Sequence, residues 1–137
     1  MALPPACKVA EAGVVMHGQG TTSPGEIGEP VDPALVHLYT APKLARIAVW
    51  ERDGFIVLVD VEGPAGTTAD YLRRLGQPEA RLDLDEDDHG SEWVWPARGV
   101  VLVVSGPTPS RLGVFPPQSL PAYRRHTRYL ERTTYFE

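Results

Sequence analysis

The densest group of side chains that could do chemistry is an acidic run in the second half of the chain. Six carboxylates lie between residues 83 and 92, with His89 and Gly90 at the turn: Asp83, Asp85, Glu86, Asp87, Asp88 and Glu92. Carboxylates at such spacing suit Ca²⁺, which takes about six to eight oxygen ligands. A calcium-binding loop begun at Asp85 places Gly90 correctly in its sixth position, but Pro96 stands where the bidentate glutamate belongs. We therefore favour a solvated turn, ahead of an acidic surface for a basic partner and, last, a metal site.

No other polar residues have a spacing typical of an enzyme. The four histidines, His17, His37, His89 and His126, are scattered and form no HxH or HExxH pattern. The serines lack a GxSxG turn, and neither GxGxxG nor GxxxxGK[ST] occurs. A serine–histidine–aspartate site assembled in space stays open, but no spacing argues for it. We expect no catalytic activity, no resident metal and no cofactor.

Aromatic and basic residues near the acidic run are the other candidates for contact with a partner. Trp93 and Trp95 are two residues apart on an expected strand, so their rings project to one face. Core packing beneath a helix is the favoured role, and an aromatic binding patch is the alternative. Arginines give a C-terminal helix a basic side, for pairing within the chain or for a two-signed docking surface: Arg124, Arg125, Arg128 and Arg132. The candidate partner-binding residues are thus Asp85, Glu86, Asp87, Asp88, Trp93, Trp95, Arg124 and Arg128.

The bulk properties favour a small acidic domain with many turns. The 137 residues fit one domain, and 14 prolines with 13 glycines favour short elements. The formal net charge of −5 argues against nucleic-acid binding, which usually requires a basic face. A partner protein with a basic surface suits this charge better.

Cys7 bears on where the protein resides. It is the only cysteine, which excludes an internal disulfide. A plain thiol is the favoured interpretation, and a lipid attachment site after "LPPA" is the alternative. The sequence as written contains no signal peptide and no apolar run long enough to span a membrane. We expect a soluble protein, cytoplasmic by default and periplasmic if a signal lies upstream of Cys7.

The elements that must position these residues begin after a segment rich in proline and glycine. Residues 1–33 are predicted to form an extended arm, and residues 34–137 a single α+β domain. "DPALVHLY" at 32–39 is expected to make one helical turn, with Asp32 as its cap and Pro33 in the first helical position.

Within the domain, local signals predict a hairpin, a short helix and several further strands. Asp53-Gly54 joins two apolar runs, 44–50 and 55–61, of which the second suits a central strand. "TTADYLRRLGQP" predicts a helix over 67–75, capped by threonine and ended by Gly76 and Pro78. More strands are expected at 81–84, 92–96, 100–105 and 111–115, and a helix at 119–131. The predicted fold is an antiparallel meander of about five or six strands, with one or two short helices on one face.

Residues 66–115 resemble half of the repeat shared by the β-lactamase inhibitor protein and the BamE-like outer-membrane assembly lipoproteins. The resemblance rests on "TTADYLRRLGQP", "DLDEDDHG", "EWVWPARG" and "VVLVVSG", in that order. It implies a protein-binding scaffold whose sheet face and loops grip a partner. Two features depart from the family pattern: a hairpin replaces the usual pair of helices before the sheet, and no lipoprotein signal is present.

Three classes of function follow, in order of preference. The first is a non-enzymatic protein-binding module, such as an inhibitor or an immunity protein that blocks its partner. The second is an envelope-associated scaffold or accessory lipoprotein. The third is a small enzyme whose site has no sequence signal.

Overall fold

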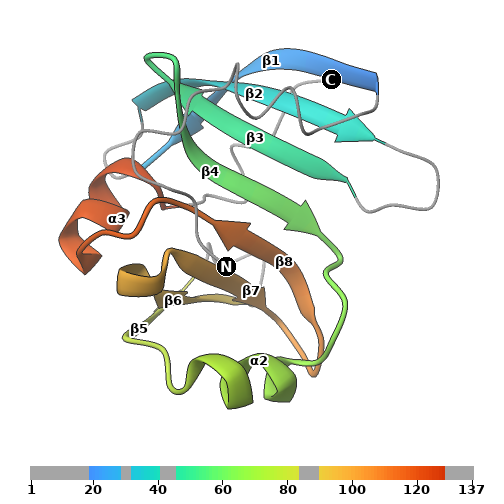
Figure 1. Cartoon of the computed structure of the whole chain (residues 1–137), viewed down its shortest axis with the longest axis vertical. Coiled ribbons are helices and arrows are strands. Elements are labelled where there is room, and N and C mark those ends of the chain that lie inside the picture. Colours follow the sequence, from blue (N-terminus) through green and yellow to red (C-terminus); the bar gives the residue numbers. More distant parts are fainter. Residues whose placement is uncertain (1–18, 29–31, 41–45, 84–89, 129–137) are drawn as a thin grey trace.

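The sheet consists of two antiparallel four-stranded meanders joined side by side. The computed structural model describes residues 19–28, 32–40, 46–83 and 90–128. Its eight strands lie in the order β1-β2-β3-β4-β8-β7-β6-β5, so that β4 pairs with β8 and the chain enters its second half at the far edge (Figure 1). The strands are β1 (Gln19–Ile27), β2 (Asp32–Thr40), β3 (Ile47–Arg52), β4 (Phe55–Glu62), β5 (Ala80–Asp83), β6 (Ser91–Trp95), β7 (Val100–Val104) and β8 (Pro109–Val114). The predicted antiparallel α+β class is confirmed, with more strands than the five or six expected.

The two additional strands come from the segment predicted as an arm and a helical turn. Residues 19–27 form β1, the strand at one edge of the sheet, and pair with β2 along their whole length. Pro24 is tolerated there because an edge strand needs ladder hydrogen bonds on one side only. The sheet therefore begins before residue 34, where we placed the start of the domain.

The helical turn predicted at residues 32–39 is wrong. Asp32 and Pro33 resemble the start of a helix, but the residues after them alternate between buried and more exposed positions. Ala34, Val36 and Leu38 are buried, while Leu35 is exposed and His37 is half-buried. This period of two belongs to a strand with one face on the core, and pairing with β1 and β3 outweighs the local helix-start signal.

The predicted hairpin is confirmed. Asp53 and Gly54 connect β3 to β4 with φ angles of 55° and 85°, which suit a two-residue turn between twisted strands. Strand β4 lies between β3 and β8, the central position that its apolar sequence predicts.

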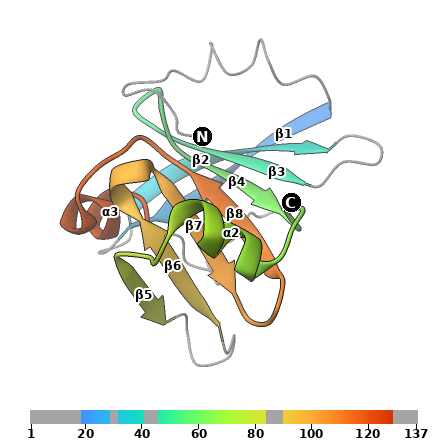
Figure 2. The same ribbon diagram turned by 60° about the horizontal axis from the view of Figure 1, so that its bottom comes forward.

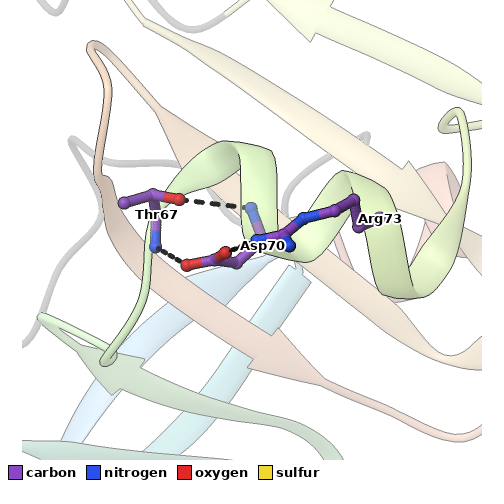
Figure 3. A network of polar contacts seen from close by, with 3 residues as sticks. All are labelled: Thr67, Asp70 and Arg73. Carbon is purple, nitrogen blue, oxygen red and sulfur yellow. Dashed lines mark hydrogen bonds and ion pairs between the residues drawn. The ribbon is translucent and has the colours of Figure 1, made fainter.

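Helix α2 (Thr68–Leu75) also forms as its local sequence predicts. The Thr67 hydroxyl accepts a hydrogen bond from the Asp70 backbone N–H, and the Asp70 carboxylate accepts one from the Thr67 N–H, at 3.2 and 3.1 Å (Figure 3). Arg73 pairs with the same carboxylate. Gly76 ends the helix with a positive φ of 77°. This short helix is thus specified by its own caps, and packing holds it on the sheet.

The two helices cover opposite faces of the sheet, not one face as predicted. Helix α2 lies over the second half of the sheet (Figure 2). Its residues Tyr71, Leu72 and Leu75 pack on one face, against these side chains: Trp95, Val100, Leu102, Val104, Leu112 and Val114. Helix α3 (Leu120–His126) packs Tyr123 and Leu120 on the other face, in a core shared with Val36, Trp50 and Leu58 of the first half. In the described part of the chain, no helix is long and apolar enough to cross a membrane.

The C-terminal end of α3 connects the two halves of the sheet. Ser119 caps its start as predicted, and the helix ends at His126, earlier than expected. The Arg52 guanidinium at the end of β3 donates a hydrogen bond to the His126 carbonyl oxygen. The Gly28 N–H, just after β1, donates to the Arg128 carbonyl oxygen at 3.2 Å. The backbone after α3 is therefore held by the first meander, while its side chains reach the second.

Candidate functional site

The acidic run is carried by the β5–β6 hairpin, and a buried carboxylate marks one end of it. Glu92 on β6 is fully buried, because strand alternation places it on the same inner face as Val94. The Tyr123 hydroxyl donates to its Oε2 atom at 2.8 Å, and the Arg128 Nε atom lies 3.6 Å from the same oxygen. A buried carboxylate needs such partners, since burial without them is costly. Glu92 is thus a structural anchor and not part of an exposed acidic surface.

Arg128 reaches both strands of the hairpin. Its Nε atom approaches Glu92, and its Nη2 atom donates a hydrogen bond to the backbone carbonyl oxygen of Asp83 at 2.7 Å. Asp83 is the last residue of β5, and Glu92 is the second residue of β6. Of the residues between these strands, 84–89 are outside the described part of the chain. They include Asp85, Glu86, Asp87 and Asp88, whose arrangement therefore stays a prediction.

The two tryptophans lie beneath α2. Trp95 is almost fully buried, and its Nε1–H donates to the Gly76 carbonyl oxygen at 3.1 Å, where α2 ends. Trp93 is half-buried beside the same cluster, with the Arg81 guanidinium 4.1 Å from its ring centroid. Trp95 therefore belongs to the core, the favoured interpretation, while Trp93 keeps one side near the surface.

The basic residues on α3 and just after it also differ in their surroundings. Arg124 is exposed on the helix, whereas the Arg128 side chain retains 11% of its exposure and points toward Glu92 and Asp83. For Arg128, the structure favours pairing within the chain over a place on a docking surface.

A second polar group, which the sequence analysis did not predict, crosses the first three strands. Thr22, His37 and Glu51 follow one another on β1, β2 and β3 and are joined by hydrogen bonds of 2.9 and 3.0 Å. These residues are far apart in sequence, and only the register of β1, β2 and β3 brings them together. Recognising the period of two in β2 could have placed His37 on the face opposite Val36.

The described residues form shallow hollows and no metal cluster. One hollow of about 350 Å³ lies at the β3–β4 turn and is lined by Pro33, Ala34, Leu35, Glu51, Arg52, Asp53 and Gly54. A hollow of about 200 Å³ lies beside α2 and is lined by Ala65, Gly66, Asp70, Tyr71 and Arg74. Among the described residues, no three His, Cys, Asp or Glu side chains are grouped so that they could hold a metal ion.

Comparison with known proteins leaves the resemblance of residues 66–115 untested. No protein-family model matches the chain, and no curated protein or solved structure matches it. The likeness to the β-lactamase inhibitor protein and the BamE-like lipoproteins stays a prediction.

The buried Tyr123–Glu92 contact predicts an unusual alkaline titration. Burial, followed by the charge of Glu92 and the hydrogen bond to it, raises the pKa of Tyr123 well above its ordinary value. The folded state therefore keeps this proton above about pH 10, where the unfolded chain releases it, and the free energy of unfolding falls as pH rises. We expect Tyr123→Phe to reduce this alkaline loss of stability. Because Tyr123 keeps its proton in the folded protein, the variant should show the same absorbance titration of its other tyrosines as the wild type. If a tyrosine that titrates in the ordinary range in the wild type were missing from the variant, the assignment would be contradicted.

Proposed function

We propose that the protein is a non-enzymatic protein-binding module of the inhibitor or immunity type, which presents the acidic segment between β5 and β6 to a basic surface of its partner. The observation that carries the proposal is the attachment of Arg128 to both strands of this hairpin. Loops that bind partners are commonly held by a rigid scaffold, and this anchor fixes the two strands from which the segment emerges.

The distribution of charge supports an acidic rather than a two-signed surface. Arg128 is committed to Glu92 and Asp83 inside the molecule. Asp85, Glu86, Asp87 and Asp88 are consecutive in sequence, in a chain with a net charge of −5. Such a concentration of negative charge accelerates the encounter with a positively charged surface.

Two further residues from the sequence analysis, Trp93 and Arg124, are candidates for contact with the partner outside the acidic segment. Trp93 lies two residues from Ser91, to whose hydroxyl its Nε1–H donates at 2.8 Å, and Arg124 is exposed on α3. Trp95 would act indirectly, by supporting the hairpin from the core.

The test is a capture experiment in lysate of the source cells that compares two variants with the same charge change. Asp87→Asn/Asp88→Asn neutralises the segment, and Asp53→Asn/Glu79→Gln neutralises two exposed acids elsewhere. Both variants should have the melting temperature of the wild type, because Asp53 and Glu79 are exposed, Asp87 and Asp88 are expected to be solvated, and solvated charges contribute little stability. We expect the wild type and the Asp53/Glu79 variant to retain the same partner, identified by mass spectrometry, and the Asp87/Asp88 variant to lose it. Equal capture by all three proteins, or by none, would overturn the proposal.

A further inference from the structure

Thr22, His37 and Glu51 form a hydroxyl–imidazole–carboxylate line across three strands. The Thr22 Oγ1 atom lies 2.9 Å from His37 Nδ1, and His37 Nε2 lies 3.0 Å from Glu51 Oε2. Thr22 is exposed, while the side chains of His37 and Glu51 each retain 16% of their exposure. A hydroxyl within reach of a base that a third group orients is the geometric signature of an activated nucleophile.

The carboxylate determines which ring nitrogen of a neutral His37 carries the proton. An ionised Glu51 can only accept, so Nε2 carries the hydrogen and donates it. Nδ1 then has a free electron pair, which accepts the hydrogen bond from the Thr22 hydroxyl. The strand register holds this order, since Thr22 and His37 are direct cross-strand partners and Leu35 is the partner of Glu51.

A hollow adjoins this line. The hollow of about 350 Å³ at the β3–β4 turn includes Glu51 itself and Leu35, which precedes His37 by two residues on the same side of β2. Leu35 is 45% exposed, so its side chain adds apolar surface to this hollow. A small apolar group in this hollow would lie beside Glu51 and Leu35, two residues along β2 from His37, whose cross-strand partner is Thr22.

We propose that Thr22 is an acyl acceptor for activated esters with a short apolar acyl group, with His37 as its base and Glu51 as a positioning residue. The Thr22 oxygen attacks the ester carbonyl carbon and forms a new Oγ–C bond, while its proton moves to His37 Nδ1. The bond from the carbonyl carbon to the alcohol oxygen then breaks, and the proton passes to the departing alcohol. The products are an O-acyl threonine and one free alcohol.

This site is separate from the proposed partner-binding segment. It lies on β1, β2 and β3, whereas the acidic segment follows β5 at the opposite edge of the sheet. Acylation of Thr22 is a single event for each chain and requires no turnover. The failure of either proposal leaves the other standing.

The test uses p-nitrophenyl butyrate with the full-length protein, and intact mass and fragment spectra as readouts. We expect one butyryl group per chain on Thr22, kept in Thr22→Ser and absent in Thr22→Val. Thr21→Val is the matched control and should still be modified. His37→Gln should slow the modification about 100-fold, the low end of what general-base assistance supplies.

Glu51 is tested through the ring nitrogens of His37. Nitrogen NMR should show the proton on Nε2 in the wild type and a mixture of tautomers in Glu51→Leu, which should also acylate more slowly. Circular dichroism verifies that each variant is folded. Butyryl groups found only on lysines or the N-terminus, or equal Thr22 modification rates in the wild type and folded His37→Gln, would overturn the proposal.

Discussion

Replacing Glu92 with alanine is expected to lower the free energy of unfolding by about 3–5 kcal/mol, because removing one partner leaves a buried charged group uncompensated. Glu92 is fully buried, and both the Tyr123 hydroxyl and the Arg128 guanidinium are directed at it. Arg128 also holds Asp83, so the loss should extend to both strands of the hairpin. Chemical denaturation measures the change.

Two variants give this prediction its scale. Tyr123→Phe removes only the hydroxyl and should cost about 1–3 kcal/mol, the usual penalty for an unsatisfied buried group. Glu79→Ala removes an exposed carboxylate just before β5 and should change stability by less than about 0.5 kcal/mol. If Glu92→Ala proved as mild as Glu79→Ala, Glu92 would not be the anchor described above.

The second large effect is expected at Gly99, where the chain turns from the short helix η1 (Pro96–Arg98) into β7. Its φ angle is 66°, and a Cβ atom there would overlap the carbonyl oxygen of Phe115. The Gly99 carbonyl oxygen also accepts a hydrogen bond from the Phe115 N–H at 2.9 Å, so neither segment can easily move away. Gly99→Ala should therefore cost about 2–5 kcal/mol, from the left-handed conformation and from overpacking together.

Gly63 provides the matched control for this substitution. Its φ angle is 64°, close to that of Gly99, but a Cβ atom there would meet nothing within 4 Å. Gly63→Ala should cost only the conformational part, about 1–2 kcal/mol. If chemical denaturation showed the same loss of unfolding free energy for the two variants, the approach of Phe115 to Gly99 would not be a tight constraint.

The elements that the sequence predicted well are those specified by adjacent residues. Asp53-Gly54 determines a turn by itself, and α2 is capped by hydrogen bonds between Thr67 and Asp70, which are three positions apart in the sequence. Ser119 likewise caps α3 by accepting a hydrogen bond from the Ala122 N–H. In these segments the local preference and the final fold agree.

The elements that were missed depend on distant partners. Strands β1 and β2 contain Pro24 and Pro33, which suggested an arm and a helix start, but pairing across the sheet decides their conformation. The site shows the same limit. In the sequence, Glu92 is one of six acidic residues in a short run. Its contacts with Tyr123 and Arg128 depend on the packing of α3 and the residues after it against the sheet. His37 and Glu51 are likewise joined by strand register alone.

The central claim, that the acidic segment guides binding to a basic partner, is tested most directly by association kinetics at several salt concentrations. The captured partner would be measured against the wild type and against a variant with Asp85→Asn, Glu86→Gln, Asp87→Asn and Asp88→Asn. For the wild type, the association rate constant should fall steeply as salt rises, because screening weakens attraction between exposed charges. The variant should associate more slowly at low salt and respond only weakly to salt. Equal rate constants and equal salt dependence for the two proteins would contradict the claim and leave the segment a solvated turn.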